Sequence, residues 1–186
     1  GEGHFESVVG MIQQLSQVNG NTICPEMIVV GIPNTDRIRD LTPTHAATGL
    51  DGDSAFVMTS GGGEKFTTFI EKELIPHIDS LYPASRYRVF IGHSIGGLMV
   101  VNTLIHHTSL FNSYIAIDPS LWWDQQKLLK QADEVLGKKD FNKRMLFLGI
   151  ANTMNPGMDT TQVRKDTSVS SLHIKSMFLF ADALKK

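Results

Sequence analysis

The chain has little cysteine and no long apolar run. Cys24 is its one cysteine, so no disulfide can form within the chain. No stretch approaches the ~20 consecutive apolar residues of a membrane-spanning helix, and the sequence shows no signal-peptide pattern. We therefore expect no membrane association, and the compartment stays open between cytoplasm and periplasm.

An excess of charge of one sign is also lacking. Lys and Arg number 17 against 19 Asp and Glu, which gives a formal net charge of −2. Because this balance offers no broad basic surface, we expect neither nucleic acid nor an anionic membrane as a partner. No His or Cys residues show the short spacing of a metal site, and we expect neither a metal ion nor a cofactor.

What is present is typical of a globular α/β protein. With 186 residues, 41% of them hydrophobic, the chain suits a single domain over residues 1–186. Short β-branched runs alternate with segments whose apolar residues recur at helical spacing. The runs predict strands at 27–32, 89–92, 113–118 and 145–151, and the segments predict helices at 5–17, 66–81, 95–107, 121–136 and 173–184. This alternation predicts a mostly parallel sheet flanked by helices.

Two long irregular stretches, residues 31–56 and 151–171, follow the first and the last of these strands. Loops of this length in a compact domain are usually functional or disordered. Both leave carboxyl ends of strands, which is where open α/β sheets bind ligands. We therefore expect the functional site at this edge of the sheet.

The sequence G-H-S-I-G, residues 92–96, stands between a predicted strand and a predicted helix. In that context the pattern predicts a nucleophile elbow, in which Ser94 sits on a sharp turn with its Oγ free. The glycines would let strand and helix approach closely, and the Ile95 amide at the helix N-terminus could stabilise an oxyanion. The alternative is a glycine-rich turn that binds phosphate, although neither phosphate-binding glycine motif is present. His93 is expected to pack beneath the turn and not to serve as the base.

Three stretches, "GIPNTDRIRDLTP" from Gly31, "FIGHSIGG" from Phe90 and "AIDPSLWWD" from Ala116, resemble the "Putative esterase" family of α/β-hydrolases. That family includes ferric-enterobactin (siderophore trilactone) esterases and relatives of S-formylglutathione hydrolase. The resemblance implies an α/β-hydrolase-type sheet and a serine hydrolase that cleaves carboxylic esters through an acyl-enzyme. Ser94 would be the nucleophile, and the Ile95 amide would be one oxyanion donor.

The resemblance also implies that the fold is incomplete at both ends. Family members begin with further strands, and the loop after the last of these supplies the second oxyanion donor, which here only Gly1 or Glu2 could provide. They also continue past the helix resembling "SMFLFADALKK" to a segment that carries the catalytic histidine, which has no counterpart in this sequence. A missing strand would leave a gap in the sheet, which a homodimer or a complementing chain could fill through the sheet edge.

Several residues are candidates for the remaining roles. His45 in the first long loop and His173 after the second could act as a substitute base, the alternative being loop packing. Arg37 or Arg39 could face an anionic substrate, or both could anchor the loop through salt bridges. Of Trp122 and Trp123, one is expected in the core and the other in the substrate pocket, for which Trp123 is preferred, and Asp118 is expected to shape the strand end. The sequence thus predicts a serine esterase acting on a small-molecule ester, of short-acyl or siderophore type. The alternative is a catalytically incomplete hydrolase-fold domain that binds a ligand or a complementing chain.

Overall fold

The computed structural model describes residues 2–20 and 23–185. The chain divides into two compact units, Gly1–Thr35 and Asp36–Lys186. Each unit is described by itself below, and the single domain expected over residues 1–186 stays a prediction. Among the described residues, no helix combines the length and the apolar character needed to cross a membrane.

The first unit contains one long helix and an extended segment. Helix α1 spans Glu2–Ser16, and a short 3-10 helix, η1, spans Val18–Gly20. The helix expected at 5–17 is thereby confirmed, with a start three residues earlier. The strand expected at 27–32 is wrong, because no described residue pairs with this segment in a β-ladder. Its apolar pattern fits a strand, but a strand forms only against a partner, and Met27, Ile28 and Val30 are exposed.

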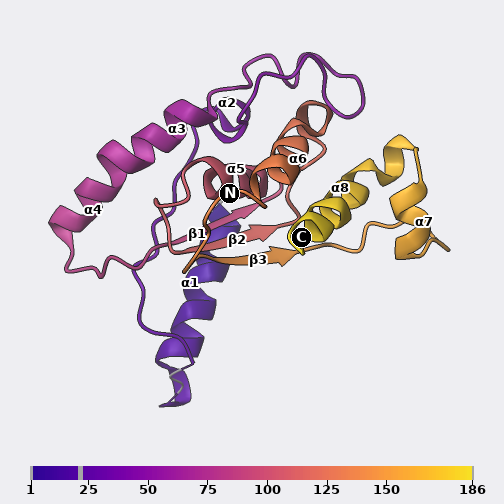
Figure 1. Ribbon diagram of the computed structural model, residues 1–186. Coiled ribbons are helices and arrows are strands. Elements are labelled where there is room, and N and C mark those ends of the chain that lie inside the picture. The colour runs from indigo at the N-terminus through magenta and orange to yellow at the C-terminus, as the bar shows by residue number, and fades with distance from the viewer. Residues whose placement is uncertain (1, 21–22, 186) are drawn as a thin grey trace. The chain divides into compact units, whose positions relative to one another are not determined.

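The second unit is built on a three-stranded sheet in the order β1-β2-β3. The strands are β1 (Val89–His93), β2 (Ser113–Ile117) and β3 (Met145–Gly149). Both pairings are parallel, with Val89 opposite Ser113 and Ser113 opposite Met145. The parallel α/β arrangement expected from the sequence is confirmed, with three of the four expected strands (Figure 1).

One face of the sheet carries the core. Helix α5 (Ile95–His106) packs on β1 and β2, and ten of its residues are buried. The side chains of Tyr114 and Ala116 point to this face and are fully buried. The opposite face exposes apolar side chains in every strand, and Phe147 on the edge strand β3 is 62% exposed. Because side chains alternate between the two faces of a strand, one face of the sheet is buried under α5 while the other face keeps exposed apolar side chains.

A long helical run precedes the sheet. It consists of α3 (Gly63–Phe69), the π-helical turn η2 (Ile70–Leu74) and α4 (Ile75–Leu81), which confirms the helix expected at 66–81. Inside the run, the Ile75 amide donates to the Ile70 carbonyl five residues back. Pro76 follows and has no amide hydrogen to donate, so the π turn lies where the regular helical ladder is interrupted.

Helices α6 (Trp123–Val135), α7 (Thr160–Lys165) and α8 (Val169–Ala183) complete the unit. The helix expected at 121–136 is confirmed, although its first turn contains the left-handed residues Asp124, Gln125 and Gln126. Helix α8 packs against α6, and the side-chain Nε2 of Gln126 donates to Ser176 Oγ at 2.8 Å. It begins at Val169 where the sequence predicted His173.

The connection between β1 and α5 depends on two glycines. A Cβ at Gly92 would collide with the carbonyl carbon and oxygen of Gly96, so the end of the strand and the first helical turn touch through bare backbone. A Cβ at Gly97 would lie 3.0 Å from the Ile117 carbonyl oxygen. A Cβ at Gly96 would meet only Leu41, at 4.0 Å. The close packing expected of Gly92 and Gly97 is confirmed, whereas the close approach expected to require glycine at Gly96 is not, because a side chain has room there.

These contacts predict opposite effects of two alanine substitutions in one turn. We expect Gly92→Ala to prevent folding or to lower the free energy of unfolding by several kcal/mol, because backbone cannot move aside as a flexible side chain can. Gly96→Ala should fold and be about 0.5–1 kcal/mol more stable, since alanine is the better helix former. Urea unfolding followed by circular dichroism measures both, and equal destabilisation by the two variants would contradict the close approach at Gly92.

Candidate active site

Ser94 occupies the turn between β1 and α5. Its backbone angles are φ 58° and ψ −119°, a conformation that L-residues rarely adopt. Its amide donates to the Ile117 carbonyl at 2.9 Å, and its carbonyl accepts the Leu98 amide at 2.9 Å. Anchored on both sides, the serine is half-buried at the carboxyl edge of the sheet, in the strained turn that the sequence pattern predicted.

The helix N-terminus lies directly beside this serine. Ile95 is the first residue of α5, and the first amides of a helix have no partner within it. Their N–H dipoles point toward the turn and favour negative charge there. The second oxyanion donor, predicted from Gly1 or Glu2, stays a prediction: Gly1 lies outside the described residues, and Glu2 begins α1 in the other unit.

Ser120 is the side-chain partner of Ser94. The two Oγ atoms lie 3.3 Å apart, and the Ser120 amide donates to the Ser94 carbonyl at 3.1 Å. Ser120 is only 2% exposed. It follows β2 by three residues, so the end of the neighbouring strand brings it against the elbow.

Asp118 and His173 form a half-buried pair at the same edge. Asp118 Oδ2 lies 3.0 Å from His173 Nε2, and Asp118 Oδ1 accepts the Ala151 amide at 3.1 Å. Asp118 has a positive φ of 48°, and its own amide donates to the Gly149 carbonyl at 2.7 Å. His173 Nδ1 is buried without a hydrogen-bond partner among the described residues. The pair thus ties α8 to the ends of β2 and β3.

His45 lies exposed in the long loop before α3. Its Nδ1 lies 3.1 Å from Ser60 Oγ, and that hydroxyl donates its own hydrogen to the Val57 carbonyl. Nδ1 must therefore be the donor in its contact with Ser60, which leaves the lone pair of the neutral ring on Nε2. In the part of the chain that the structure describes, neither His45 nor His173 hydrogen-bonds with Ser94.

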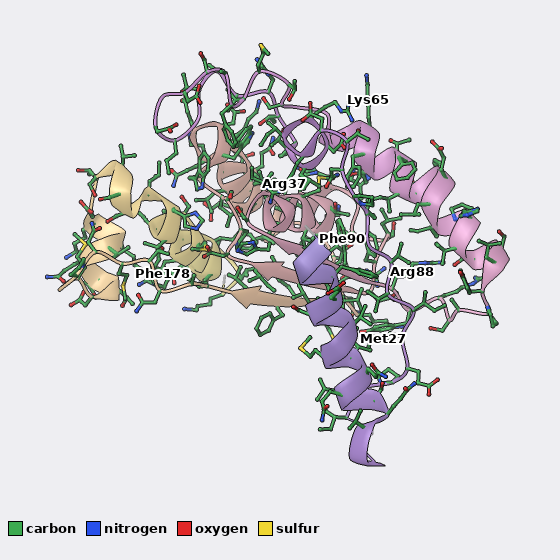
Figure 2. All side chains as sticks on the ribbon, turned by 180° about the vertical axis from the view of Figure 1, so that it is seen from behind. Met27, Arg37, Lys65, Arg88, Phe90 and Phe178 are labelled. Atoms are coloured by element: carbon green, nitrogen blue, oxygen red, sulfur yellow. The ribbon has the colours of Figure 1, made fainter. Side chains whose placement is uncertain are left out.

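His93 is exposed and does not pack beneath the turn as expected. Its carbonyl lies 3.5 Å from the guanidinium of Arg37 (Figure 2), which comes from the short helix α2 (Arg37–Leu41). Asp36 caps this helix by accepting the Arg39 amide, and this bond is the largest cause that lowers the pKa of the Asp36 carboxyl. Arg39 pairs with Asp40 at 2.8 Å, which raises the pKa of the Arg39 guanidinium.

Trp122 and Trp123 have different surroundings. Trp123 is 2% exposed, and its indole N–H donates to the Thr44 carbonyl at 3.0 Å, which fastens the long loop to the start of α6. Its expected contact with substrate stays a prediction. Trp122 instead lines an open cavity of about 470 Å³, together with Leu50, Asp51, Asp53, Phe56, Val169 and Ser170.

Sequence reasoning missed Ser120 at this edge, gave Asp118 only a role in shaping the strand end, and preferred Trp123 to Trp122 as the pocket residue. All of these residues belong to the segment "DPSLWW" at the end of a predicted strand, and its place at a strand end was the available signal. Among the described residues, no group of three or more His, Cys, Asp or Glu side chains is arranged to hold a metal ion.

The comparisons with known proteins agree with this geometry. The sequence profile of the family described as "Putative esterase" matches residues 5–173. Ferri-bacillibactin esterase BesA of Bacillus subtilis is 36% identical over 92 residues, which cover 49% of this chain and 32% of that protein. Siderophore enterobactin esterase of Emericella nidulans is 34% identical over 119 residues, which cover 57% of this chain and 39% of that protein.

Solved structures extend the likeness to nearly the whole chain. An IroE-like serine hydrolase from Shewanella oneidensis superposes with a TM-score of 0.85 at 37% identity, covering 99% of this chain and 56% of that one. Siderophore hydrolase EstA from Aspergillus nidulans shares the fold, with a TM-score of 0.57 at 24% identity. The chain therefore spans between a third and somewhat more than half of the length of these relatives, as a partial α/β-hydrolase-like fold.

Proposed function

This chain belongs to the "Putative esterase" family, and we propose that it is a serine esterase that cleaves carboxylic esters through an acyl-enzyme on Ser94. The single observation that carries the proposal is the backbone of Ser94. A positive φ between a strand and a helix N-terminus is costly, and it sets the Oγ beside the first amides of α5 without using it as a helix cap. An ordinary loop serine has no need of such a conformation.

In the proposed reaction, Ser94 Oγ attacks the ester carbonyl while a histidine accepts its proton. The Ile95 amide donates to the oxyanion of the tetrahedral intermediate. The intermediate expels the alcohol, which takes the proton from the histidine, and leaves an acyl group on Ser94. Water, activated by the same histidine, then releases the acid and restores the serine.

Of the two predicted bases, His45 is the better suited. Its Nδ1–H is held by Ser60, so its Nε2 presents a lone pair on an exposed side chain. His173 directs Nε2 at the Asp118 carboxylate, and its other nitrogen is buried. We therefore assign the base to His45 in this proposal and give His173 a structural role through Asp118.

Hydrolysis of p-nitrophenyl butyrate by the 186-residue chain and three variants tests these assignments. Ser94→Ala should abolish turnover, because the acyl-enzyme cannot form. His45→Gln should lower kcat roughly 10²–10⁴-fold, the usual contribution of a general base, without changing the urea midpoint. His173→Gln should lower the midpoint and reduce kcat less.

The control is His77→Gln, which alters an exposed histidine on α4 far along the chain from the elbow and should match the wild type in both measurements. Equal turnover by wild type and Ser94→Ala would contradict the esterase proposal. A larger kcat loss in His173→Gln than in His45→Gln, at unchanged stability, would move the base to His173.

The substrate side of the proposal combines the cavity with Arg37. The cavity begins at Trp122, two residues after Ser120, which places their Cα atoms within about 7 Å of each other. Its lining is mainly apolar, with two carboxylates and no basic side chain, which suits an uncharged part of an ester. Among the described residues no carboxylate forms an ion pair with Arg37, and its guanidinium lies beside His93, the residue before Ser94. We assign it to an anionic substrate group, as in the siderophore-type esters that the relatives' names suggest.

Two p-nitrophenyl esters of equal length test Arg37. We expect Arg37→Gln to raise KM for mono-p-nitrophenyl succinate about two- to fivefold, the range of an exposed charge pair, and to leave KM for p-nitrophenyl butyrate unchanged. Arg39→Gln is the matched control, because Asp40 already neutralises that guanidinium. An equal effect of Arg37→Gln on both esters would rule out charge recognition.

A second candidate function is that of an incomplete hydrolase-fold domain that pairs with another chain. The observation that favours it is that, among the described residues, neither His45 nor His173 hydrogen-bonds with Ser94. β1 and β3 are the edges of the sheet, and an edge strand offers unpaired backbone groups to a second chain.

The mass of the protein in solution tests this candidate. Pairing through the sheet edge predicts a dimer at micromolar concentration, which sedimentation velocity would report as twice the mass of one 20.6 kDa chain. Ile91→Pro, which would remove an amide on the free edge of β1, should then shift the dimer toward monomer. A strictly monomeric wild type would exclude pairing with a second copy.

A further inference from the structure

We propose that Ser120 donates a hydrogen bond to Ser94 Oγ and stabilises the charge that develops on this atom when its proton leaves. The inference rests on the proposed function in assigning Ser94 as the nucleophile. Ser120 would then be a catalytic residue, since its hydroxyl touches the reacting atom at 3.3 Å. Asp118 and His173 would be positioning residues, which act through the turn that carries Ser120.

The direction of this hydrogen bond follows from burial. Ser120 is 2% exposed, and a buried hydroxyl hydrogen needs an acceptor. Among the described residues, the partner recorded for the Ser120 hydroxyl is Ser94 Oγ. Ser94 is half-buried and can direct its own hydrogen outward to a base or to water. Ser120 is therefore the donor, and Ser94 Oγ keeps its proton free for transfer.

The backbone around Ser120 is held on every side. Its amide donates to the Ser94 carbonyl at 3.1 Å, and its carbonyl accepts the Trp123 amide at 3.0 Å. The residue before Ser120 is Pro119, whose φ is fixed by its ring. Asp118, two residues before, is fastened through its main chain to Gly149 and through its side chain to Ala151 and His173. A hydroxyl on so fixed a turn can meet a developing charge without reorganising.

Ser120 neither gives up nor accepts a proton in the proposed reaction. The proton of Ser94 Oγ passes to the base, and Ser120 keeps its own hydrogen throughout. What changes is the strength of the bond, because a hydrogen bond to an ionised acceptor is roughly twice as strong as one between neutral groups. The contact therefore lowers the pKa of the Ser94 hydroxyl, and its removal should slow the chemical step more than substrate binding.

A thiol at position 94 reports this effect without any need for esterase activity. We would make Ser94→Cys in a Cys24→Ser background, which removes the one native thiol, and follow thiolate absorbance near 240 nm as pH rises. Adding Ser120→Ala should raise the thiol pKa by about one pH unit, because the thiolate loses a donor. The control is Ser176→Ala, another fully buried serine, whose hydroxyl bonds within α8 and to Gln126.

In the chain that keeps Ser94, Ser120→Ala should lower kcat for p-nitrophenyl butyrate about tenfold with little change in KM. This is the pattern of a contact that strengthens in the transition state. Asp118→Asn should produce a smaller thiol shift in the same direction. If Ser120→Ala does not fold, as judged by circular dichroism, Ser120→Gly removes the same hydroxyl.

The outcomes separate this inference from the proposed function. An unchanged thiol pKa in Ser120→Ala overturns the inference, whether or not the wild type hydrolyses esters. A raised thiol pKa together with an inert wild type sustains the hydrogen bond and refutes the esterase activity. An equal shift in Ser176→Ala also overturns the inference, since the effect would then be general to loss of a buried hydroxyl.

Discussion

The site depends on the contact between bare backbone at Gly92 and Gly96. Because no side chain separates the end of β1 from the first turn of α5, a single residue, Ser94, connects the strand to the helix. This connecting residue has a positive φ of 58°. The same turn carries the Ser94 hydroxyl, which contacts Ser120 Oγ, and sets the Ile95 amide beside it. The positions of the proposed nucleophile and of the proposed oxyanion donor thus both follow from one close backbone contact.

Strain at Ser94 persists because the neighbouring strands oppose its release. The Ser94 amide is bound to the end of β2, and the residue after β2 is bound in turn to the end of β3 through the Gly149 carbonyl. Relaxing Ser94 would break hydrogen bonds that join the ends of the strands. His173 extends this chain of constraint to α8. The strained residue is therefore supported by most of the second unit.

The features that the sequence could predict are those that depend on residues close together in the chain. The strands of the sheet, helix α5 and the elbow are each encoded by a continuous pattern of apolar residues and glycines. Helix α7 was missed although Asp159 and Gln162 form a capping box, because six residues show no apolar periodicity. The segment at 27–32 has the pattern of a strand, but pairing depends on a partner that a local pattern does not contain. Contacts such as Trp123 with Thr44, 79 residues apart, leave no local signal at all.

The proposed nucleophile, Ser94, and its proposed base, His45, also differ in what determines their positions. The elbow is closed by β1, β2, α5 and the turn after β2, so it forms whether or not a base is near. Hydrogen bonds and a helix N-terminus lower the pKa of a serine hydroxyl, yet an alcohol still needs a base to give up its proton at neutral pH. That base must come from a loop such as the one that carries His45, whose position is set by contacts with Ser60 and not by the elbow. The thiol pKa at position 94 therefore measures the turn, while ester turnover measures the turn together with its base.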